Sequence, residues 1–244
     1  MAKRAGKTKR PARTGPARWR FRPLAWAGFL LLRITTIVVV VVTALVLLYT
    51  VVNPPITHTI WAEKRRLGSV DRQWAPLEAV APVMARSVVA AEDANFCLHW
   101  GFDMAAIREA IDQGGTRGAS TLTQQTVKNV FLWQGRSWPR KALEALMTPA
   151  VELVWTKRRT LEIYLNVAEF GKGVFGIEAA AQHYFGVSAK ELSGARAALL
   201  AAALPNPKER NPARPSGFLR KRARQIAEGA ATIDADGRAA CFQG

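Results

Sequence analysis

The chain has 244 residues, enough for one globular domain of ordinary size together with a non-globular segment, but too few for two catalytic domains. Its formal net charge is +17, and ten of its 35 basic residues lie within the first 33 positions, where there is no acidic residue. The other 25 basic residues face 18 acidic ones, so most of the excess lies near the N-terminus. No zinc-ligand cluster or RNA-binding fingerprint accompanies this charge, which argues against a nucleic-acid partner and favours membrane-linked phosphates.

An apolar run within residues 23–52 predicts a single transmembrane anchor. Positions 34–52 are 19 consecutive residues without a charge, and a helix of that length spans about 28 Å, close to the thickness of a bilayer's hydrocarbon core. A cleaved signal peptide and a buried core helix are the alternatives, but the run is longer than the usual signal-peptide core. Because basic residues are concentrated in 1–22, the positive-inside rule predicts a cytoplasmic tail there and places the rest of the chain outside.

Beyond the run, the sequence predicts an interfacial linker, a mainly α domain and a tail. Residues 53–75 mix tryptophans with charges after a Pro-Pro break, and residues 231–244 have no assigned role. Apolar positions recur every three or four residues in the domain, 76–230, so few strands are expected. The predicted helices cover 81–92, 103–113, 121–131, 138–156, 159–168, 174–184, 188–202 and 216–229.

Two residue types in this domain lead to specific structural expectations. Pro149 falls inside the helix predicted at 138–156 and should kink or split it. Cys97 and Cys241 are the only cysteines. An oxidising exterior would permit one bridge between them, but the prediction is two unpaired thiols.

Two adjacent carboxylates, Glu92 and Asp93, follow the largely apolar stretch 83–91 and form the first candidate site. A carboxylate at the end of an apolar helix can lose part of its hydration, which raises its pKa and suits it to proton transfer near neutral pH. The alternative is a solvated helix end, with Asp103 as an ordinary N-cap of the next helix. This segment by itself leaves both interpretations open.

Small hydroxyl residues open the helix predicted at 121–131, whose free N–H groups would favour an anion. Thr121 and Gln125 are four residues apart and Gln125 and Lys128 three apart, so these side chains share one helix face. That face could hold a phosphate or a sugar. The same residues are equally compatible with a surface helix capped by Ser120.

Three cations, Arg136, Arg140 and Lys141, lie just before and within the start of the helix predicted at 138–156. The plain interpretation is a pair of intrahelical salt bridges to Glu144, which follows Arg140 by four residues and Lys141 by three. Cations at a helix N-terminus oppose the helix dipole, so their placement needs another reason. An anionic ligand such as a pyrophosphate supplies one.

These segments, in this order, resemble the glycosyltransferase family 51 domain that forms peptidoglycan strands, in particular its monofunctional biosynthetic branch. The resemblance runs from about residue 76 to residue 211 and includes two further blocks, at 159–186 and 199–207. It implies a mainly α, lysozyme-like glycosyltransferase domain with a small membrane-associated jaw. It also implies that lipid II is the acceptor and a growing lipid-linked chain the donor, joined into β-1,4-linked strands by inverting single displacement with release of undecaprenyl diphosphate.

By position, the resemblance implies that Glu92 is the general base that takes the proton from the acceptor's 4-hydroxyl. It implies that Glu144 assists the leaving group or positions a metal ion. The other predicted site residues would bind substrate by shaping the acceptor site, lining the donor cleft or meeting the pyrophosphate; they are Asp93, Phe96, His99, Thr121, Gln125, Lys128, Arg136, Arg140 and Lys141. No cofactor is required by the resemblance, and a divalent Mg or Mn ion is left open.

Two rival functions are a membrane-anchored lytic glycosidase and a non-catalytic glycan-binding scaffold. A glycosidase needs two carboxylates about the scissile bond, whereas the pattern here offers clustered cations. A scaffold predicts that Glu92→Gln functions like the wild type. The expected partners of the enzyme are lipid II, the growing glycan chain, the membrane and other wall-synthesis or division proteins. The expected location is the bacterial inner membrane, with the catalytic domain in the periplasm.

Overall fold

The computed structural model describes residues 23–114, 118–135 and 137–243. They belong to two units, one ending at Ala44 and the other beginning at Leu45. The first holds most of α1 (Pro23–Leu48), and Leu24–Leu48 is long and apolar enough to cross a membrane. The helix overlaps the predicted anchor region 23–52, but it includes Arg33 and stops short of Val52. The predicted basic tail, 1–22, lies outside the described residues.

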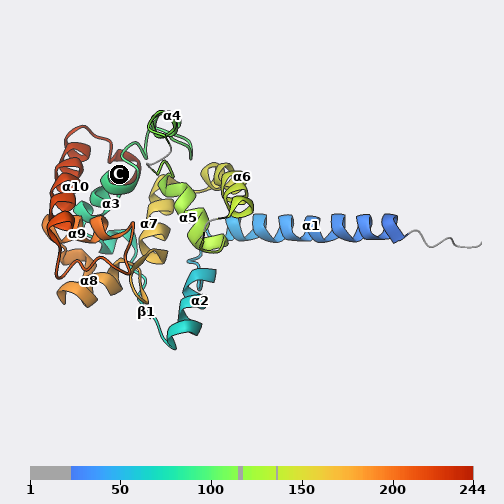
Figure 1. The fold of residues 1–244 in the computed structure, drawn as a ribbon, viewed down its shortest axis with the longest axis horizontal. Coiled ribbons are helices and arrows are strands. Elements are labelled where there is room, and N and C mark those ends of the chain that lie inside the picture. The colour runs from blue at the N-terminus through green and yellow to red at the C-terminus, as the bar shows by residue number, and fades with distance from the viewer. Residues whose placement is uncertain (1–22, 115–117, 136, 244) are drawn as a thin grey trace, which may run out of the picture. The chain divides into compact units, whose positions relative to one another are not determined.

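The second unit is mainly helical in the part of the chain that the structure describes, which confirms the predicted fold class (Figure 1). Its elements in chain order are α2 (His58–Leu67), β1 (Asp71–Arg72), η1 (Leu77–Ala79), α3 (Pro82–Glu92), α4 (Met104–Asp112), α5 (Leu122–Phe131), α6 (Trp138–Val154), α7 (Lys157–Val167), β2 (Glu169–Gly171), β3 (Val174–Phe175), α8 (Ile177–Phe185), η2 (Ala189–Glu191), α9 (Gly194–Ala203), α10 (Gly217–Ala235) and α11 (Ala240–Gln243).

The hydrophobic core lies where α3, α9 and α10 pack against one another. Helix α9 contributes small side chains to this contact, among them Ala198, Ala201 and Ala202, which are buried. Small residues let helix backbones approach closely, and close packing fixes where each helix ends. Helix α5 packs on α6 and α7, and α11 packs on α7. The end of α3 is thereby held between α10 and the α5 region.

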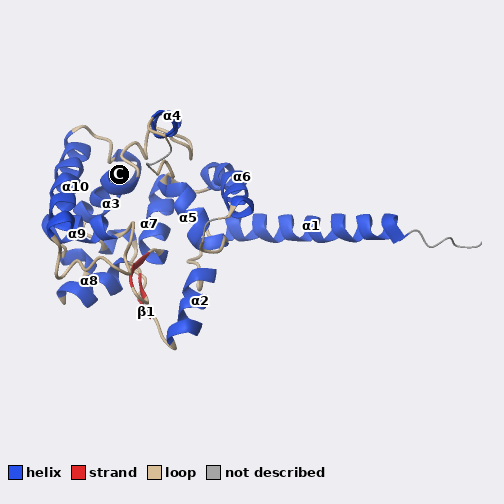
Figure 2. Cartoon of the chain, in the orientation of Figure 1, coloured by secondary structure: helices blue, strands red, loops and turns tan. Residues whose placement is uncertain are grey.

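The strands are short and form one small sheet with the order β1-β3-β2 (Figure 2). Strand β1 pairs with β3 in parallel, with Asp71 opposite Val174, and β2 pairs with β3 antiparallel. The sheet therefore joins the segment before α3 to the hairpin between α7 and α8.

Three features differ from the sequence-based expectations. Helix α2 lies within the segment expected to be an interfacial linker, and Thr57 caps it by accepting a hydrogen bond from the N–H of Ile60. Helix α6 continues through Pro149 and is not split, because its buried residues, such as Thr148 and Val151, are held against the neighbouring helices. Residues 231–243, expected to be a tail, complete α10 and form α11, where Phe242 is only 1% exposed.

The expectation of two unpaired thiols is wrong. Cys97 and Cys241 form a disulfide, with Cα atoms 5.7 Å apart. The two residues are separated by 144 positions, and they meet only because the segment after α10 folds back against the loop that follows α3. Spacing in the sequence carries no trace of this return.

Candidate active site

Glu92 is the last residue of α3, and it lies at a cavity because the helix packs its other residues into the core. Met84, Ala85, Val88 and Val89 are all buried, which fixes the direction of the helix. The cavity has a volume of about 510 Å³. Its lining comes from the end of α3, the loop before α5, α4, α5 and α10, and includes Glu92, Asp93, Asn95, Asp103, Ser120, Thr121, Gln125, Pro205 and Arg222.

The Glu92 carboxylate is only partly satisfied. Its Oε2 accepts a hydrogen bond of 2.9 Å from Nε2 of Gln125, while its Oε1 is inaccessible and has no partner among the described residues. Burial raises the pKa of this carboxyl group, and the Gln125 hydrogen bond and nearby cations offset part of that rise. A carboxylate in this condition is suited to accepting a proton near neutral pH.

Gln125 is oriented from its other end by Tyr164 of α7. The fully buried Tyr164 donates from its hydroxyl to Oε1 of Gln125 over 3.3 Å, so the amide nitrogen of Gln125 faces Glu92. Tyr164 cannot easily lose this proton, since burial raises its pKa well above the ordinary value. The chain from Tyr164 through Gln125 thus fixes the position of Glu92's carboxylate.

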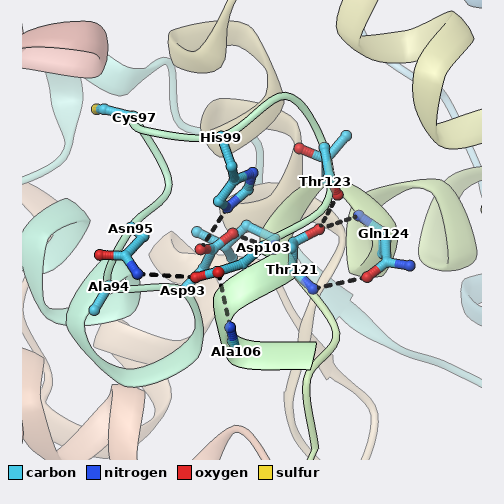
Figure 3. Close-up of polar contacts among 12 residues, drawn as sticks. Asp93, Ala94, Asn95, Cys97, His99, Asp103, Ala106, Thr121, Thr123 and Gln124 are labelled. Carbon is cyan, nitrogen blue, oxygen red and sulfur yellow. Dashed lines mark hydrogen bonds and ion pairs between the residues drawn. The ribbon is translucent and has the colours of Figure 1, made fainter. Parts of the chain in front are cut away.

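Asp93 lies beside Glu92 but is fully engaged in holding the local structure (Figure 3). Its Oδ1 contacts Nε2 of His99 at 2.8 Å, and its Oδ2 accepts from the backbone N–H of Leu122 at 2.9 Å. It therefore ties the loop 93–101 to the first turn of α5. His99 lines neither this cavity nor the one described below, and its Nδ1 is buried without a partner among the described residues.

The starts of α4 and α5 are fixed by side-chain caps beside the cavity. Asp103 accepts from the N–H of Ala106 at 2.9 Å, as the N-cap interpretation predicted. Thr121, rather than Ser120, caps α5 in a capping box with Gln124. The Thr121 hydroxyl also donates to the carbonyl of Gly101 at 2.7 Å, so α5 is held to the loop 93–101 a second time.

Phe96 points into the core rather than the cavity. It is fully buried, its ring centroid lies 6.4 Å from that of Phe242, and Nζ of Lys157 lies 4.6 Å from the ring centre. At the end of the same loop, Gly101 has φ +80°, and a Cβ there would come within 2.7 Å of Cγ2 of Thr148. The loop 93–101 is therefore closely fitted to the helices beneath it.

The cations of α5 and α6 line a second cavity of about 320 Å³, together with Ser120, Gln125 and Glu144. Glu144 is buried and accepts from Nη1 of Arg140 at 2.6 Å and from Nζ of Lys141. Both predicted intrahelical salt bridges are therefore present. Nζ of Lys141 also donates to Oγ of Ser120 at 3.1 Å.

Lys128 is the third cation of this cavity, and it has neither a hydrogen bond nor an ion pair with any residue that the structure describes. Burial lowers its pKa, and the neighbouring Arg140 and Lys141 lower it further, against the opposing effect of Glu144. Three cations and one carboxylate leave a surplus of two positive charges. A site of this kind is suited to a doubly charged anion such as a diphosphate.

Arg222 of α10 lines the first cavity and was not among the predicted site residues. Its Nε is buried and has no partner among the described residues, and its charge lowers the pKa of Glu92. A signal for it does exist in the sequence. Arg222 stands beside the buried positions Leu219, Ala223 and Ile226 of an amphipathic helix, so its side chain starts at the edge of the buried face.

The comparisons with known proteins identify the family. A family model described as "Transglycosylase" matches residues 60–231. The chain belongs to the transglycosylase family. A protein of Jannaschia sp. (strain CCS1) named "Biosynthetic peptidoglycan transglycosylase" is 56% identical to it, with 99% of each chain covered. A protein of Yersinia pestis (strain Pestoides F) with the same name is 54% identical over 63% of this chain and 66% of its own length.

The transglycosylase domain brings most of the predicted site residues to two cavities that share Ser120 and Gln125. Glu92, Asp93, Thr121 and Gln125 line the first, and Gln125, Lys128, Arg140, Lys141 and Glu144 line the second. Phe96 and His99 lie behind the first cavity. Arg136 lies outside the described residues.

The donor groups at this transglycosylase site do not fit a resident Mg or Mn ion. Asp93, His99 and Asp103 have ligand atoms within 4.8 Å of one another, but Asp93 is bonded to His99 and Leu122, and Asp103 accepts from Ala106 and Asn95. Both oxygens of Glu144 are held by cations. Hard divalent ions require several oxygen ligands free to face them, so no step is derived through a metal.

Proposed function

We propose that the chain is a peptidoglycan glycosyltransferase that polymerises lipid II into β-1,4-linked glycan strands and releases undecaprenyl diphosphate. The observation that carries the proposal is the placement of Glu92 and the three cations on two cavities joined by Ser120 and Gln125. One cavity offers a proton acceptor and the other a site for a diphosphate. Membership of the transglycosylase family and the names of the relatives support the same activity.

Glu92 acts as the general base in this proposal. Its carboxylate takes the proton from the acceptor's 4-hydroxyl as that oxygen attacks the anomeric carbon of the donor, and the bond from that carbon to the diphosphate breaks. Inversion at the anomeric carbon needs one base and no covalent nucleophile. The desolvated carboxylate, oriented by Gln125, supports this role because its pKa is raised toward the working pH.

Lys128, Arg140 and Lys141 stabilise the diphosphate leaving group, and we assign Arg136 to the same task. A diphosphate leaves as a stable anion, so neutralising its charge helps more than protonating it. Glu144 is a positioning residue in this scheme, since both of its oxygens are bonded to Arg140 and Lys141. It holds the two cations toward the cavity and is not a proton donor.

Arg222 is proposed to bind the acceptor. It enters the Glu92 cavity from α10, on the opposite side from the α6 cations, and it has no carboxylate partner among the described residues. The acceptor also carries a diphosphate, which a guanidinium can bind through two hydrogen bonds. Asp93, Thr121, Phe96 and His99 support both sites by fixing the loop 93–101 and the start of α5.

The geometry favours a transferase over the two rival functions. A glycosidase would need a second carboxylate free to work on the bond, but Asp93, the nearest one in the chain, is bonded to His99 and Leu122. A scaffold has no use for a carboxylate oxygen that is buried without a partner, because leaving it unpaired costs stability.

The proposed location is the bacterial inner membrane, with α1 as the anchor, a cytoplasmic N-terminus and the catalytic domain in the periplasm. The apolar helix and the distribution of basic residues support this orientation. The Cys97–Cys241 disulfide supports it independently, because disulfides persist outside the cytoplasm. The proposed partners are lipid II, the growing glycan chain, the membrane and other wall-synthesis or division proteins.

The proposal is tested with the purified full chain in detergent and lipid II as substrate. We expect glycan polymer from the wild type, and a loss of rate of about 100-fold or more for Glu92→Gln, the usual effect of removing a general base. Glu228→Gln, the same substitution on the exposed side of α10, serves as the control and should retain activity.

Each contrary outcome is distinct. Absence of polymer from folded wild-type protein would rule out the glycosyltransferase. Release of soluble muropeptides from preformed glycan would favour the lytic enzyme. Full function of Glu92→Gln would favour the scaffold.

A further inference from the structure

The segment that follows α10, residues 236–243, contacts the loop 93–101 at three successive points. Nη1 of Arg238 donates to the carbonyl of Ala94 at 3.0 Å, and the ring centroid of Phe242 lies 6.4 Å from that of Phe96. Between these two contacts, Cys241 is bonded to Cys97. We call residues 236–243 the strap. In Figure 3, Cys97 points away from the polar cluster around Asp93, so the strap and the cluster hold different sides of one loop.

The strap is itself seated on the rigid part of the domain. The carbonyl of Phe242 accepts from Nη1 of Arg158 at 2.9 Å, at the start of α7. Gln243 donates to the carbonyl of Pro82 at 2.9 Å and accepts from Arg86 at 3.1 Å, both on α3. Phe242 is 1% exposed. The loop 93–101 is therefore fastened, through the strap, to the helix that carries Glu92.

The loop needs this support because it contains little regular structure. Its internal backbone hydrogen bonds include Phe96 to Asp93 and Leu98 to Asn95, which form turns and no helix. At the same time it holds α5 twice, through Asp93 to the N–H of Leu122 and through Thr121 to the carbonyl of Gly101. Any movement of the loop would therefore move α5, and with it the Gln125 amide that orients Glu92.

We propose that the strap is a positioning element for the catalytic carboxylate, and that the Cys97–Cys241 disulfide makes full activity depend on an oxidising compartment. The inference rests on the proposed function. In the oxidation step the two thiols lose two protons and two electrons and form one S–S bond. A disulfide-bearing oxidant of the extracytoplasmic space accepts the electrons and is reduced to two thiols. Both cysteines are partly exposed, so such reagents can reach them.

The test compares the oxidised full chain, the same protein reduced with dithiothreitol, and a Cys97→Ala/Cys241→Ala double variant. All three are assayed for kcat, KM and the pH profile, well below the Tm of the least stable form. We expect reduction to lower kcat about tenfold, on the scale of catalytic losses from sub-ångström displacement. We also expect it to move the acid limb of the profile to higher pH, because Glu92 loses the well-aligned hydrogen bond from Gln125.

Two controls separate positioning from stability. Reoxidation with oxidised glutathione should restore the wild type, while the double variant should keep the low activity with or without reductant. Arg238→Ala, which removes a strap contact without touching the disulfide, should move the pH limb in the same direction, and Arg238→Lys should recover part of the effect. If the reduced protein and the double variant lose only Tm and keep both kcat and the pH profile, the disulfide is merely stabilising and the proposal is overturned.

A second readout is independent of catalysis. Amide hydrogen exchange of Leu122 and of the loop 93–101 should accelerate on reduction, since the Asp93 contact to α5 loosens. If the oxidised wild type makes no polymer, the proposed function fails and this exchange measurement still decides the strap. Unchanged exchange would overturn it.

Discussion

At the scale of single residues, the site depends on groups whose charge is poorly compensated in the folded protein. Glu92 keeps an unpaired buried oxygen, and Lys128 keeps a buried ammonium that is unpaired among the described residues. Each is unfavourable for folding, because a desolvated charge without a partner costs free energy. Such compromises are typical of sites where the missing partner is the substrate.

The first residue-scale prediction concerns Gln125 and the pH dependence of the reaction. In Gln125→Ala the Glu92 carboxylate stays buried but loses the hydrogen bond that lowers its pKa, so that pKa rises further. A general base works only when deprotonated, so the acid limb of kcat/KM should move to higher pH. The measurement is a pH profile of lipid II polymerisation.

Two variants serve as references for that profile. Gln182→Ala removes an exposed glutamine of α8 and should leave the profile unchanged. Tyr164→Phe removes only the contact behind Gln125 and should give a smaller shift in the same direction. A limb that stays in place in Gln125→Ala would mean that Gln125 does not tune the base.

The second residue-scale prediction concerns Lys128. Because burial lowers its folded-state pKa, its charge costs stability throughout the pH range below that pKa, and the cost disappears only when the lysine is neutral in both the folded and the unfolded state. Lys128→Met should therefore raise Tm at pH 7 by a few degrees, the change that about 1 kcal/mol makes in a domain of this size. The same change should raise KM for lipid II about tenfold, since one charge-assisted hydrogen bond is lost.

Calorimetry and steady-state kinetics check the two halves of the Lys128 prediction. Lys221→Met, on the exposed side of α10, is the matched control and should change neither quantity. A variant that is less stable than the wild type and binds lipid II equally well would contradict both the electrostatic argument and the assignment.

At the scale of elements, α5 is the helix that joins the two halves of the site. Its N-cap Thr121 is fixed to the loop 93–101, and Gln125 and Lys128 follow at helical spacing on one face. The sequence predicted this face, because spacings of three and four determine neighbours on a helix whatever its tertiary surroundings. The capping residue was assigned to Ser120 instead of Thr121, since adjacent hydroxyl residues cap equally well until Gln124 is seen to complete the box.

Contacts between elements were less predictable than the elements themselves. The helical periodicity located α3 to α10 closely, and the salt bridges of Glu144 followed from local spacing. Arg222 was missed because its approach to Glu92 depends on how α10 packs against α3, which no local pattern encodes. Phe96 was assigned to the substrate site by resemblance, yet its ring packs against Phe242 in the core.

At the scale of the whole molecule, long-range returns of the chain were outside the reach of sequence reasoning. The strap meets the loop 93–101 across 144 residues, and the segment after α1 returns to α6 and α7 over more than a hundred positions. In the second unit, Nε1 of Trp155 donates to the carbonyl of Val46 at 2.7 Å. Arg159 donates to the carbonyls of Tyr49 and Val52 at 3.0 and 2.9 Å.

These contacts predict where the chain can be shortened. Removing residues 1–44 should leave the stability of the domain unchanged, because the second unit begins at Leu45. Removing residues 1–52 should destabilise it by about 2–4 kcal/mol, since Trp155 and Arg159 then lack their carbonyl partners in a largely buried setting. Urea unfolding of both shortened proteins in the same detergent, with removal of residues 1–22 as the control, measures the difference. Equal unfolding midpoints and m-values for the two would show that residues 45–52 belong to the anchor alone, and that the domain starts only after it.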